Sequence, residues 1–469
     1  MTATLVPPPQ ARPRRPARSR GGWFGSLLLR LHFYAGLLVG PFILVAATSG
    51  ALYAIAPTLD ELFYGHELHA PATATSLSLA EQIIAAETYA GEGAVLTAVR
   101  PAPEPGDTTR VMFAGDDLGA SESRAVFVDP GTGEIRGDLT AYGTSGSLPV
   151  RTWISNLHRN LHLGEPGRLY SELAASWLAI IVLAGAVLWV HRIRKARVKR
   201  ELVMPAVRRG GYRRLFSWHA SVGIWVLLGA LMLSATGITW STYAGANVSA
   251  LRAAIGGATP VLQTDLSGAE AAPDEHAAHH GGAARMPTGE ANPATFEAVL
   301  AIARRINVDT GEVEIKPPAA SGQAWTVTEI KRSFPTQADA VAIDGATMQV
   351  VSRVDFAQFP LLAKLARWGI DLHMGVLFGW VNQLALLFIA VGIGTLVVLG
   401  YAMWWTGGNK RWGSAPARGG LRAAPWWGVL SVVAIAGLIG WWLPLVGYPL
   451  IAFVVIDVLL GLRTRIRAC

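Results

Sequence analysis

Four histidines form two pairs whose spacing indicates a shared chemical role. The pairs are His158 with His373, 215 positions apart, and His32 with His219, 187 positions apart. All four lie in or next to long apolar segments, where ionisable side chains are costly and usually functional. Two imidazoles can hold one flat metal cofactor between them, so each pair predicts a haem site with two histidine ligands.

The cysteine content narrows the type of cofactor. Cys469 is the only cysteine of the chain. Covalent attachment of haem through Cys-x-x-Cys-His is therefore excluded, and so is an iron–sulfur cluster held by several cysteines of this chain. The expected cofactors are two molecules of haem b. The alternative for each pair is hydrogen bonding inside a helix bundle or at the membrane interface.

The remaining histidines carry weaker signals. His162 follows His158 by one helical turn and is an alternative ligand, but its counterpart 215 positions on is Leu377, so the repeat favours His158. His191 corresponds to Thr406 and is expected in a basic interfacial cluster, with a ligand role as the alternative. A short tract in an Ala/Gly/His-rich stretch could bind a metal ion weakly, although such tracts are more often solvated loops: His276, His279 and His280.

The composition indicates which elements must position these residues. The 469 residues are 51% hydrophobic and 15% charged, with a mean hydropathy of +0.35. A soluble domain has about 25% charged residues, so the chain is expected to be an integral membrane protein in contact with lipid. The net charge of +8 comes from Lys and Arg beside apolar segments, which fits membrane topology and argues against nucleic acid as a partner.

Apolar runs and basic clusters predict an α-helical polytopic membrane protein with about six transmembrane helices and both termini in the cytoplasm. The predicted organisation is a disordered basic cytoplasmic tail 1–23, first helix 24–56, outer domain 57–150, His-bearing segment and second helix 151–193, basic cytoplasmic loop 194–214, third helix 215–243, outer domain 244–366 with the Ala/Gly/His-rich insertion, His-bearing segment and fourth helix 367–405, cytoplasmic loop 406–425, a hairpin of the fifth and sixth helices 426–462, and cytoplasmic tail 463–469.

The two spacings define a tandem duplication. The 215-residue register also relates Asp129 to Asp344 and Thr132 to Thr347 in predicted hairpins. The 187-residue register relates Gly36 to Gly223. The two spacings, 215 and 187, differ by 28 residues, which predicts an insertion of that length in the second half. Both halves begin on the same side of the membrane, which predicts a pseudo-two-fold axis along the membrane normal. Equivalent residues then face each other across that axis.

Three motifs resemble the PepSY-associated transmembrane proteins. They are Val128-Asp-Pro-Gly-Thr-Gly-Glu134, Leu157-His-Arg-Asn-Leu-His-Leu-Gly-Glu-Pro-Gly-Arg168 and Leu372-His-Met-Gly-Val-Leu-Phe-Gly-Trp-Val-Asn-Gln383. The resemblance implies a bacterial inner-membrane protein that pairs PepSY-type outer domains with membrane helices. Together with the duplication, this predicts tandem helix–PepSY–helix halves that carry two small α+β PepSY-like domains in the periplasm. It also implies that some members are iron-regulated and look like di-haem reductases of ferric siderophores, while other PepSY proteins are similar to inhibitory modules of peptidases.

The resulting hypothesis is an electron path from the cytoplasmic histidine pair to the outer pair. No nucleotide-binding fingerprint is present, so the donor is expected to be a quinol or a cytoplasmic reductase. The expected acceptor is a ferric siderophore or another periplasmic ferric chelate. The residues expected to dock this acceptor are Trp153, Arg159, Arg168, Trp368 and Trp380. Alternatively, these residues form part of the aromatic belt and the headgroup contacts at the membrane interface. The competing hypothesis is a membrane-anchored PepSY module that binds or regulates a periplasmic protein or peptidase.

Overall fold

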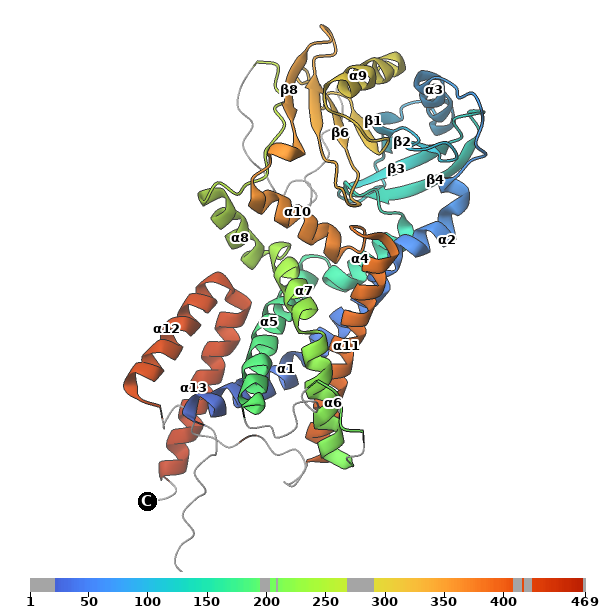
Figure 1. The fold of residues 1–469 in the computed structure, drawn as a ribbon. Helices are drawn as coiled ribbons and strands as arrows, with labels where there is room; N and C mark the ends of the chain where they lie inside the picture. The colour runs from blue at the N-terminus through green and yellow to red at the C-terminus, as the bar shows by residue number, and fades with distance from the viewer. Residues whose placement is uncertain are drawn as a thin grey trace, which may run out of the picture.

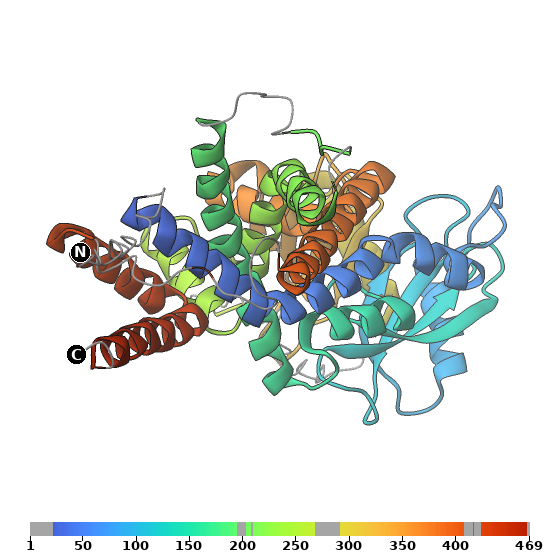
Figure 2. The same cartoon turned by 90° about the horizontal axis from the view of Figure 1, so that it is seen from below.

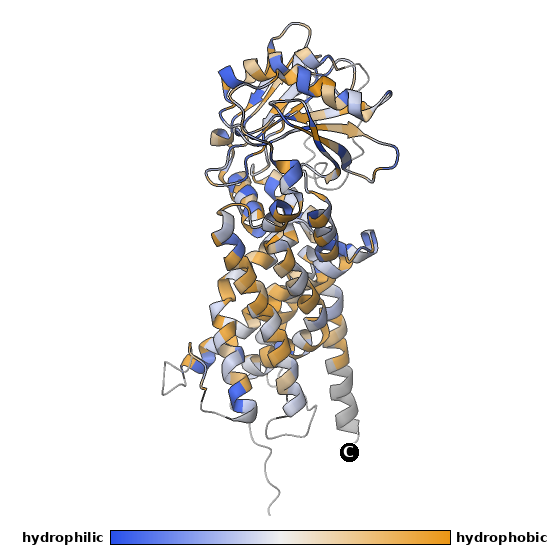
Figure 3. Cartoon of the chain, turned by 90° about the vertical axis from the view of Figure 1, so that its right-hand side faces the viewer, coloured by the Kyte–Doolittle hydropathy of each residue, from blue (hydrophilic) through white to orange (hydrophobic). Residues whose placement is uncertain are grey.

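The protein consists of a helical bundle with a sheet domain at one end (Figure 1). The structure, a computed structural model, describes residues 22–194, 203–207, 210–267, 291–407, 416 and 424–466. Hydrophobic residues dominate the middle of the bundle, whereas hydrophilic residues are frequent in the sheet domain (Figure 3). This division is typical of a protein whose bundle lies in lipid and whose sheet domain lies in water.

Three described helices are long and apolar enough to cross a membrane: α1 (Trp23–Ala54), α5 (Glu165–Ile193) and α11 (Gly379–Thr406). The expected span 215–243 is instead two helices, α6 (Gly211–Trp225) and α7 (Leu227–Thr239), bent by 61°. The bend falls at Val226, whose side chain packs closely against Gly392 of α11. Counted as one broken span, this pair is the fourth, and the chain is a multi-pass membrane protein.

Two apolar helices, α12 (Trp426–Trp442) and α13 (Pro444–Ile466), form a hairpin at the edge of the bundle (Figure 2). Pro444 begins α13, where the missing backbone N–H costs no hydrogen bond. Gly440 and Gly447 let the two backbones touch, because a side chain at either position would collide with the other helix. The hairpin packs against α5, outside the duplicated part of the chain.

The two halves contain the same elements in the same order. The first half is α1, α2 (Ala56–Leu68), α3 (Leu79–Ala90), β1 (Val95–Arg100), β2 (Thr109–Ala114), β3 (Glu122–Val128), β4 (Ile135–Tyr142), α4 (Pro149–Asn160) and α5. The second half is α6 with α7, α8 (Tyr243–Ala254), α9 (Pro293–Ile306), β5 (Val313–Lys316), β6 (Trp325–Glu329), β7 (Ala340–Ile343), β8 (Val350–Val354), the 3-10 helix η2 (Phe356–Gln358), α10 (Leu361–His373) and α11. This order agrees with the duplication that the residue spacing predicts.

The strands of both halves join in one antiparallel sheet. Its eight strands follow the order β4-β3-β2-β1-β5-β6-β7-β8, and Val99 of β1 lies opposite Ile315 of β5. Helices α3 and α9 cover the same face and contact each other over a core that includes Ile83, Phe113 and Phe296. Each of these buried side chains contributes about 1.5 to 3 kcal/mol. The shared core therefore favours one joined domain, where the sequence suggested two separate ones.

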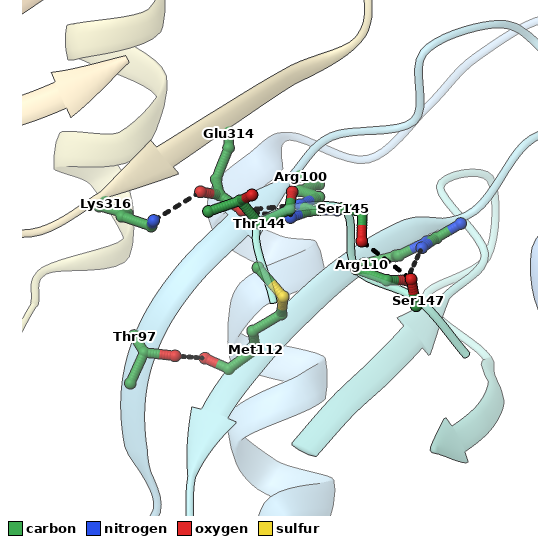
Figure 4. Close-up of polar contacts among 10 residues, drawn as sticks. Thr97, Arg100, Arg110, Met112, Thr144, Ser145, Ser147, Glu314 and Lys316 are labelled. Atoms are coloured by element: carbon green, nitrogen blue, oxygen red, sulfur yellow. Dashed lines mark hydrogen bonds and ion pairs between the residues drawn. The ribbon is translucent and has the colours of Figure 1, made fainter. Parts of the chain in front are cut away.

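A buried ion pair crosses the junction between the halves (Figure 4). Arg100 of β1 donates to Glu314 of β5 from Nε at 2.8 Å, and its side chain and that of Glu314 are each 8% exposed. Lys316 binds the other carboxylate oxygen at 2.7 Å, and Arg100 Nη2 also donates to the Thr144 carbonyl at 2.9 Å. Burial alone would raise the pKa of Glu314, but the charges and hydrogen bonds of Arg100 and Lys316 lower it to about 2.

The two hairpins at the outer edges of the sheet have the same local structure. Asp129 accepts from the Gly131 amide at 2.7 Å and from Thr132 Oγ1 at 2.9 Å. Asp344, 215 positions later, likewise accepts from an amide two residues on and from Thr347 Oγ1 at 2.7 Å. These Asx-type turns connect β3 to β4 and β7 to β8, as the sequence predicts.

Candidate haem-binding histidine pairs

The inner pair consists of His32 on α1 and His219 on α6. The centres of the two rings are 6.1 Å apart and the ring planes cross at 84°. Metal–imidazole bonds of about 2.0 Å on either side of one metal, with the ring radii added, separate two ring centres by roughly 6 to 6.5 Å. The spacing of these rings is therefore suited to a shared metal ion.

Main-chain carbonyls determine which nitrogen of each inner ring is available. His32 Nδ1 lies 2.9 Å from the carbonyl oxygen of Ile181, and His219 Nδ1 lies 3.1 Å from that of Leu396. A carbonyl can only accept, so each Nδ1 must carry the hydrogen. In the neutral imidazole Nε2 then has the free lone pair that a metal requires. Ile181 and Leu396 are themselves 215 positions apart, on α5 and α11.

The outer pair consists of His158 on α4 and His373, the last residue of α10. Their ring centres are 6.3 Å apart at an angle of 54°. The ring of His158 lies over Gly50 of α1, where an added Cβ would come within 3.1 Å of the imidazole. The structure thus brings together both pairs that the spacing predicts, each with one member from each half.

Side-chain hydroxyls contact both outer rings, and the main-chain carbonyl of Ala46 is a further hydrogen-bond partner of His158. Ser49 Oγ lies 3.0 Å from His158 Nδ1 and donates its hydrogen to the Val45 carbonyl at 2.8 Å. Thr236 Oγ1 lies 2.6 Å from His373 Nδ1 and donates to the carbonyl of residue 232 at 2.8 Å. With each hydroxyl hydrogen on a carbonyl of its own helix, each hydroxyl oxygen accepts from the imidazole N–H. Nε2 is again the open nitrogen.

An aromatic ring lies beside each outer histidine. Tyr53 stacks on His158 with ring centres 6.3 Å apart and an angle of 14°. Trp240 lies beside His373 at 6.1 Å and 54°. Tyr53 and Trp240 are 187 positions apart, so they are equivalent residues of the two halves. Both limit how the outer imidazoles can rotate.

Two glycines of the inner helices have open space beside them. A Cβ built on Gly36, four residues after His32, would meet no atom within 4 Å. At Gly223, four residues after His219, it would meet only the end of the Leu396 side chain, at 3.7 Å. All four rings lie within dense protein surroundings yet keep part of their surface accessible. The donor set, its spacing and this space fit a haem with two histidine ligands.

The alternative ligands His162 and His191 are exposed and have other partners. Helix α4 ends at Asn160 and His162 has a left-handed backbone, so it does not lie one helical turn from His158. Its exposed ring packs on Trp153, with ring centres 5.1 Å apart. His191 is exposed at the end of α5, and its Nδ1 bonds to a carbonyl of its own helix at 2.8 Å.

The expected docking residues divide into exposed and enclosed ones. Trp153 and Trp380 are 56% and 71% exposed, whereas Trp368 packs edge-on against Phe356. Arg159 donates to the Tyr142 hydroxyl at 3.0 Å and so ties α4 to the sheet. Arg168 donates at 3.3 Å to the carbonyl of Trp240, the residue beside His373, so its guanidinium lies near the outer pair.

A charged cluster adjoins the outer pair on the side of the sheet. Asp371, two residues before His373, is fully buried and accepts from Arg332 at 3.2 Å and from Arg367 at 2.9 Å. Burial, with the nearby charge of Arg367, lowers the pKa of Arg332 to about 10. Since Arg332 lies in the loop between β6 and β7, this cluster joins the sheet domain to the helix that carries His373.

The described residues contain no group of three or more His, Cys, Asp or Glu that could hold a metal ion. Sites with two histidine ligands per metal do not depend on such a group. The expected loop site at His276, His279 and His280 lies outside the described residues.

Sequence reasoning missed the residues that support the histidines. They are Ser49 with Thr236, Tyr53 with Trp240, and Ile181 with Leu396. The signal that could have found them is the repeat itself, because each of these residues lies at the 187- or 215-residue spacing from its equivalent.

Comparison with known proteins identifies the family of this chain. A search of curated proteins finds no significant match. A family model described as the PepSY-associated TM region matches residues 29–406, which include both histidine pairs and the whole sheet domain. The chain therefore belongs to the family of proteins with a PepSY-associated transmembrane region.

Proposed function

We propose that the protein is a di-haem b electron-transfer protein of the bacterial inner membrane. The observation that carries this proposal is the set of four histidines, paired across the halves at 6.1 and 6.3 Å, each with Nδ1 in a hydrogen bond. Histidines that served only as hydrogen-bond donors would not need to lie in facing pairs at both the inner and the outer position. His32 and His219 would hold one haem, and His158 and His373 the other.

Bound haem b carries one electron at a time through its Fe(III)/Fe(II) couple. The protein supplies four imidazoles that are each hydrogen-bonded at Nδ1, an apolar bundle around them, and glycines with open space beside them on the inner helices. The inner and outer pairs lie at different levels of the bundle, on the transmembrane helices α1 and α6 and on the shorter helices α4 and α10. This arrangement suits electron transfer across a membrane.

The proposed topology has six crossings, which are the three long helices, the bent pair and the α12–α13 hairpin. Clusters of Lys and Arg at 12–20, 192–214 and 463–467 favour a cytoplasmic location for both termini and for the side nearer His32 and His219. The sheet domain then lies in the periplasm as two fused PepSY-like modules. The outer pair adjoins it through the Arg332–Asp371 contact.

The proposed reaction is reduction of a ferric siderophore or similar ferric chelate. Each Fe(III) takes up one electron to become Fe(II), and a quinol on the cytoplasmic side could supply two electrons while releasing two protons. Hard oxygen ligands grip Fe(III) more tightly than Fe(II), so reduction releases the metal. Two arginines share the single carboxylate of Asp371 beside the helix that carries His373, and this excess of positive charge favours an anionic chelate as acceptor.

The cofactor can be tested with the purified full-length chain. A reduced-minus-oxidised spectrum is expected to show b haem, and acid–acetone is expected to extract it because no covalent attachment is possible. Colourless protein from haem-sufficient cells would refute the proposal.

The direction of transfer can be tested in vesicles of known orientation. Protein reduced from the cytoplasmic side should be re-oxidised by a ferric chelate supplied only on the side of the sheet domain. His373→Ala should leave the inner site reduced under the same conditions. Equal re-oxidation from either side would contradict the proposed topology.

A second function, binding of a periplasmic protein or peptidase without redox activity, is favoured by one feature of the sheet domain. A cleft of about 490 Å³ lies between the end of α3 and the strands of the first half, lined by Glu92, Asp117, Arg124 and Asp138 among others. A colourless protein that captures a peptide in this cleft would support this function. Substitution of the four paired histidines would then have no effect on binding.

A further inference from the structure

The outer and inner histidines differ in what accepts their Nδ1 hydrogens. Main-chain carbonyls of α5 and α11 accept from the inner rings, so no substitution can remove them. Side-chain hydroxyls of Ser49 and Thr236 accept from the outer rings. Only the outer site therefore has a replaceable hydroxyl at Nδ1 in each half, and at His158 the Ala46 carbonyl is a second partner, so Thr236 is the more sensitive of the two positions to substitution.

The two hydroxyls belong to a short element that the duplication preserves. Ser49 precedes Tyr53 by four residues on α1, and Thr236 precedes Trp240 by four residues at the end of α7. Residues four apart lie on the same face of a helix. In each half the hydroxyl binds Nδ1 of a histidine and the aromatic residue lies beside the same ring.

We infer that Ser49 and Thr236 are positioning residues of the outer haem site, and that they tune its redox potential separately from that of the inner site. This inference rests on the proposed haem function. Each hydroxyl would favour the tautomer that leaves Nε2 free to bind the haem iron, and Tyr53 and Trp240 lie beside the rings and restrict their rotation.

The effect on the potential follows from the direction of the hydrogen bond. An acceptor on Nδ1–H makes the imidazole a stronger electron donor, which stabilises Fe(III) relative to Fe(II). Loss of the acceptor should raise the potential of the outer haem. It should also weaken the hold on that haem, because partners of this kind typically contribute 10- to 100-fold in metal affinity.

The experiment compares Ser49→Ala and Thr236→Val in the full-length, haem-loaded protein. Spectroelectrochemical titration measures both potentials, and pyridine haemochrome analysis measures haem per chain. Difference spectra of His219→Ala and His373→Ala assign the two signals. Thr48→Val is the matched control, because Thr48 also donates to a carbonyl of α1, at 2.8 Å, but has an exposed side chain and no histidine partner.

Both variants are expected to raise the outer potential and to lose outer haem about 10- to 100-fold more readily, while the inner signal stays unchanged and reports correct folding. Ser49→Thr and Thr236→Ser, each of which copies the other half, should behave like the wild type. An unchanged outer signal, an equal shift of the inner signal, or the same shift in Thr48→Val would overturn the inference. Absence of haem from the wild type would instead overturn the proposed function, and this inference with it.

Discussion

Substitution of Glu314 tests whether the buried ion pair holds the two halves of the sheet together. A pKa of about 2 in place of 4.5 for this carboxyl corresponds to roughly 3 kcal/mol. Removal of one partner from a buried pair typically costs about 3 to 5 kcal/mol. Glu314→Gln leaves Arg100 buried with its charge unbalanced, so the junction between β1 and β5 should open more often.

The assay is hydrogen exchange by mass spectrometry on the full-length protein in detergent. A loss of about 3 kcal/mol accelerates exchange through this opening roughly 100-fold. The acceleration should appear in peptides that cover β1 and β5. Asp138→Asn is the control, because its pair with Arg124 is half-exposed and should contribute about 1 kcal/mol or less.

A double substitution and acidification complete this test. Arg100→Met combined with Glu314→Leu replaces both charges by apolar groups and should recover much of the lost protection. Because folding lowers the pKa of Glu314, its contribution is present above pH 4.5 and is lost as the pH falls towards 2. Unchanged exchange in Glu314→Gln, or acceleration no larger than in Asp138→Asn, would refute this account of the junction.

Three further predictions concern the histidines and their surroundings. Alanine in place of His32 or His219 should remove only the inner haem, and alanine in place of His158 or His373 should remove only the outer haem. His162→Ala should retain both haems, and loss of haem from this variant would contradict the pairing. Gly36→Leu should fill the space beside the inner pair and lower inner haem content, whereas Gly437→Leu in α12, where a side chain also meets no atom within 4 Å, should not. The hydrogen bond to Glu61 raises the pKa of His69 despite the opposing effect of burial, so its stabilising contribution is present below pH 6.5 and is lost as the pH rises through the folded pKa. Titration by NMR should show this raised pKa falling in Glu61→Gln, and an unchanged value would contradict the assignment.

The sequence predicts the histidine pairs well because they follow from arithmetic on repeated residues. Any residue close to a pseudo-two-fold axis faces its own copy, so His32 predicts His219 and His158 predicts His373 without knowledge of side-chain packing. The same logic prefers His158 to His162, and His158 is the ring that lies 6.3 Å from that of His373, while its role as a ligand stays a prediction. The hairpins at Asp129 and Asp344 were predictable for a different reason, since their turn chemistry is local.

Features that depend on contacts between distant segments were not predictable in this way. The bend falls at Val226, which packs closely against Gly392 of the distant helix α11, and α1 has no corresponding break although it contains Pro41. The joined sheet depends on pairing of β1 with β5, which no local pattern specifies. Strand β1 contains the charged residue Arg100, and strand β5 contains Glu314. These charges within strands are compatible with a buried ion pair but do not identify the two partners.

The duplication also explains how the ligand geometry is divided between the halves. Each histidine receives its Nδ1 acceptor from its own half, as with His32 and Ile181 or His373 and Thr236. Each half therefore sets the tautomer of its own rings independently of the other. A metal site forms only where the halves meet, so in the proposed function bound haem would stabilise the interface between halves more than either half alone. Removal of haem is expected to increase hydrogen exchange at the contacts between α1 and α11, but not within the sheet. Equal increases in both regions would contradict this expectation.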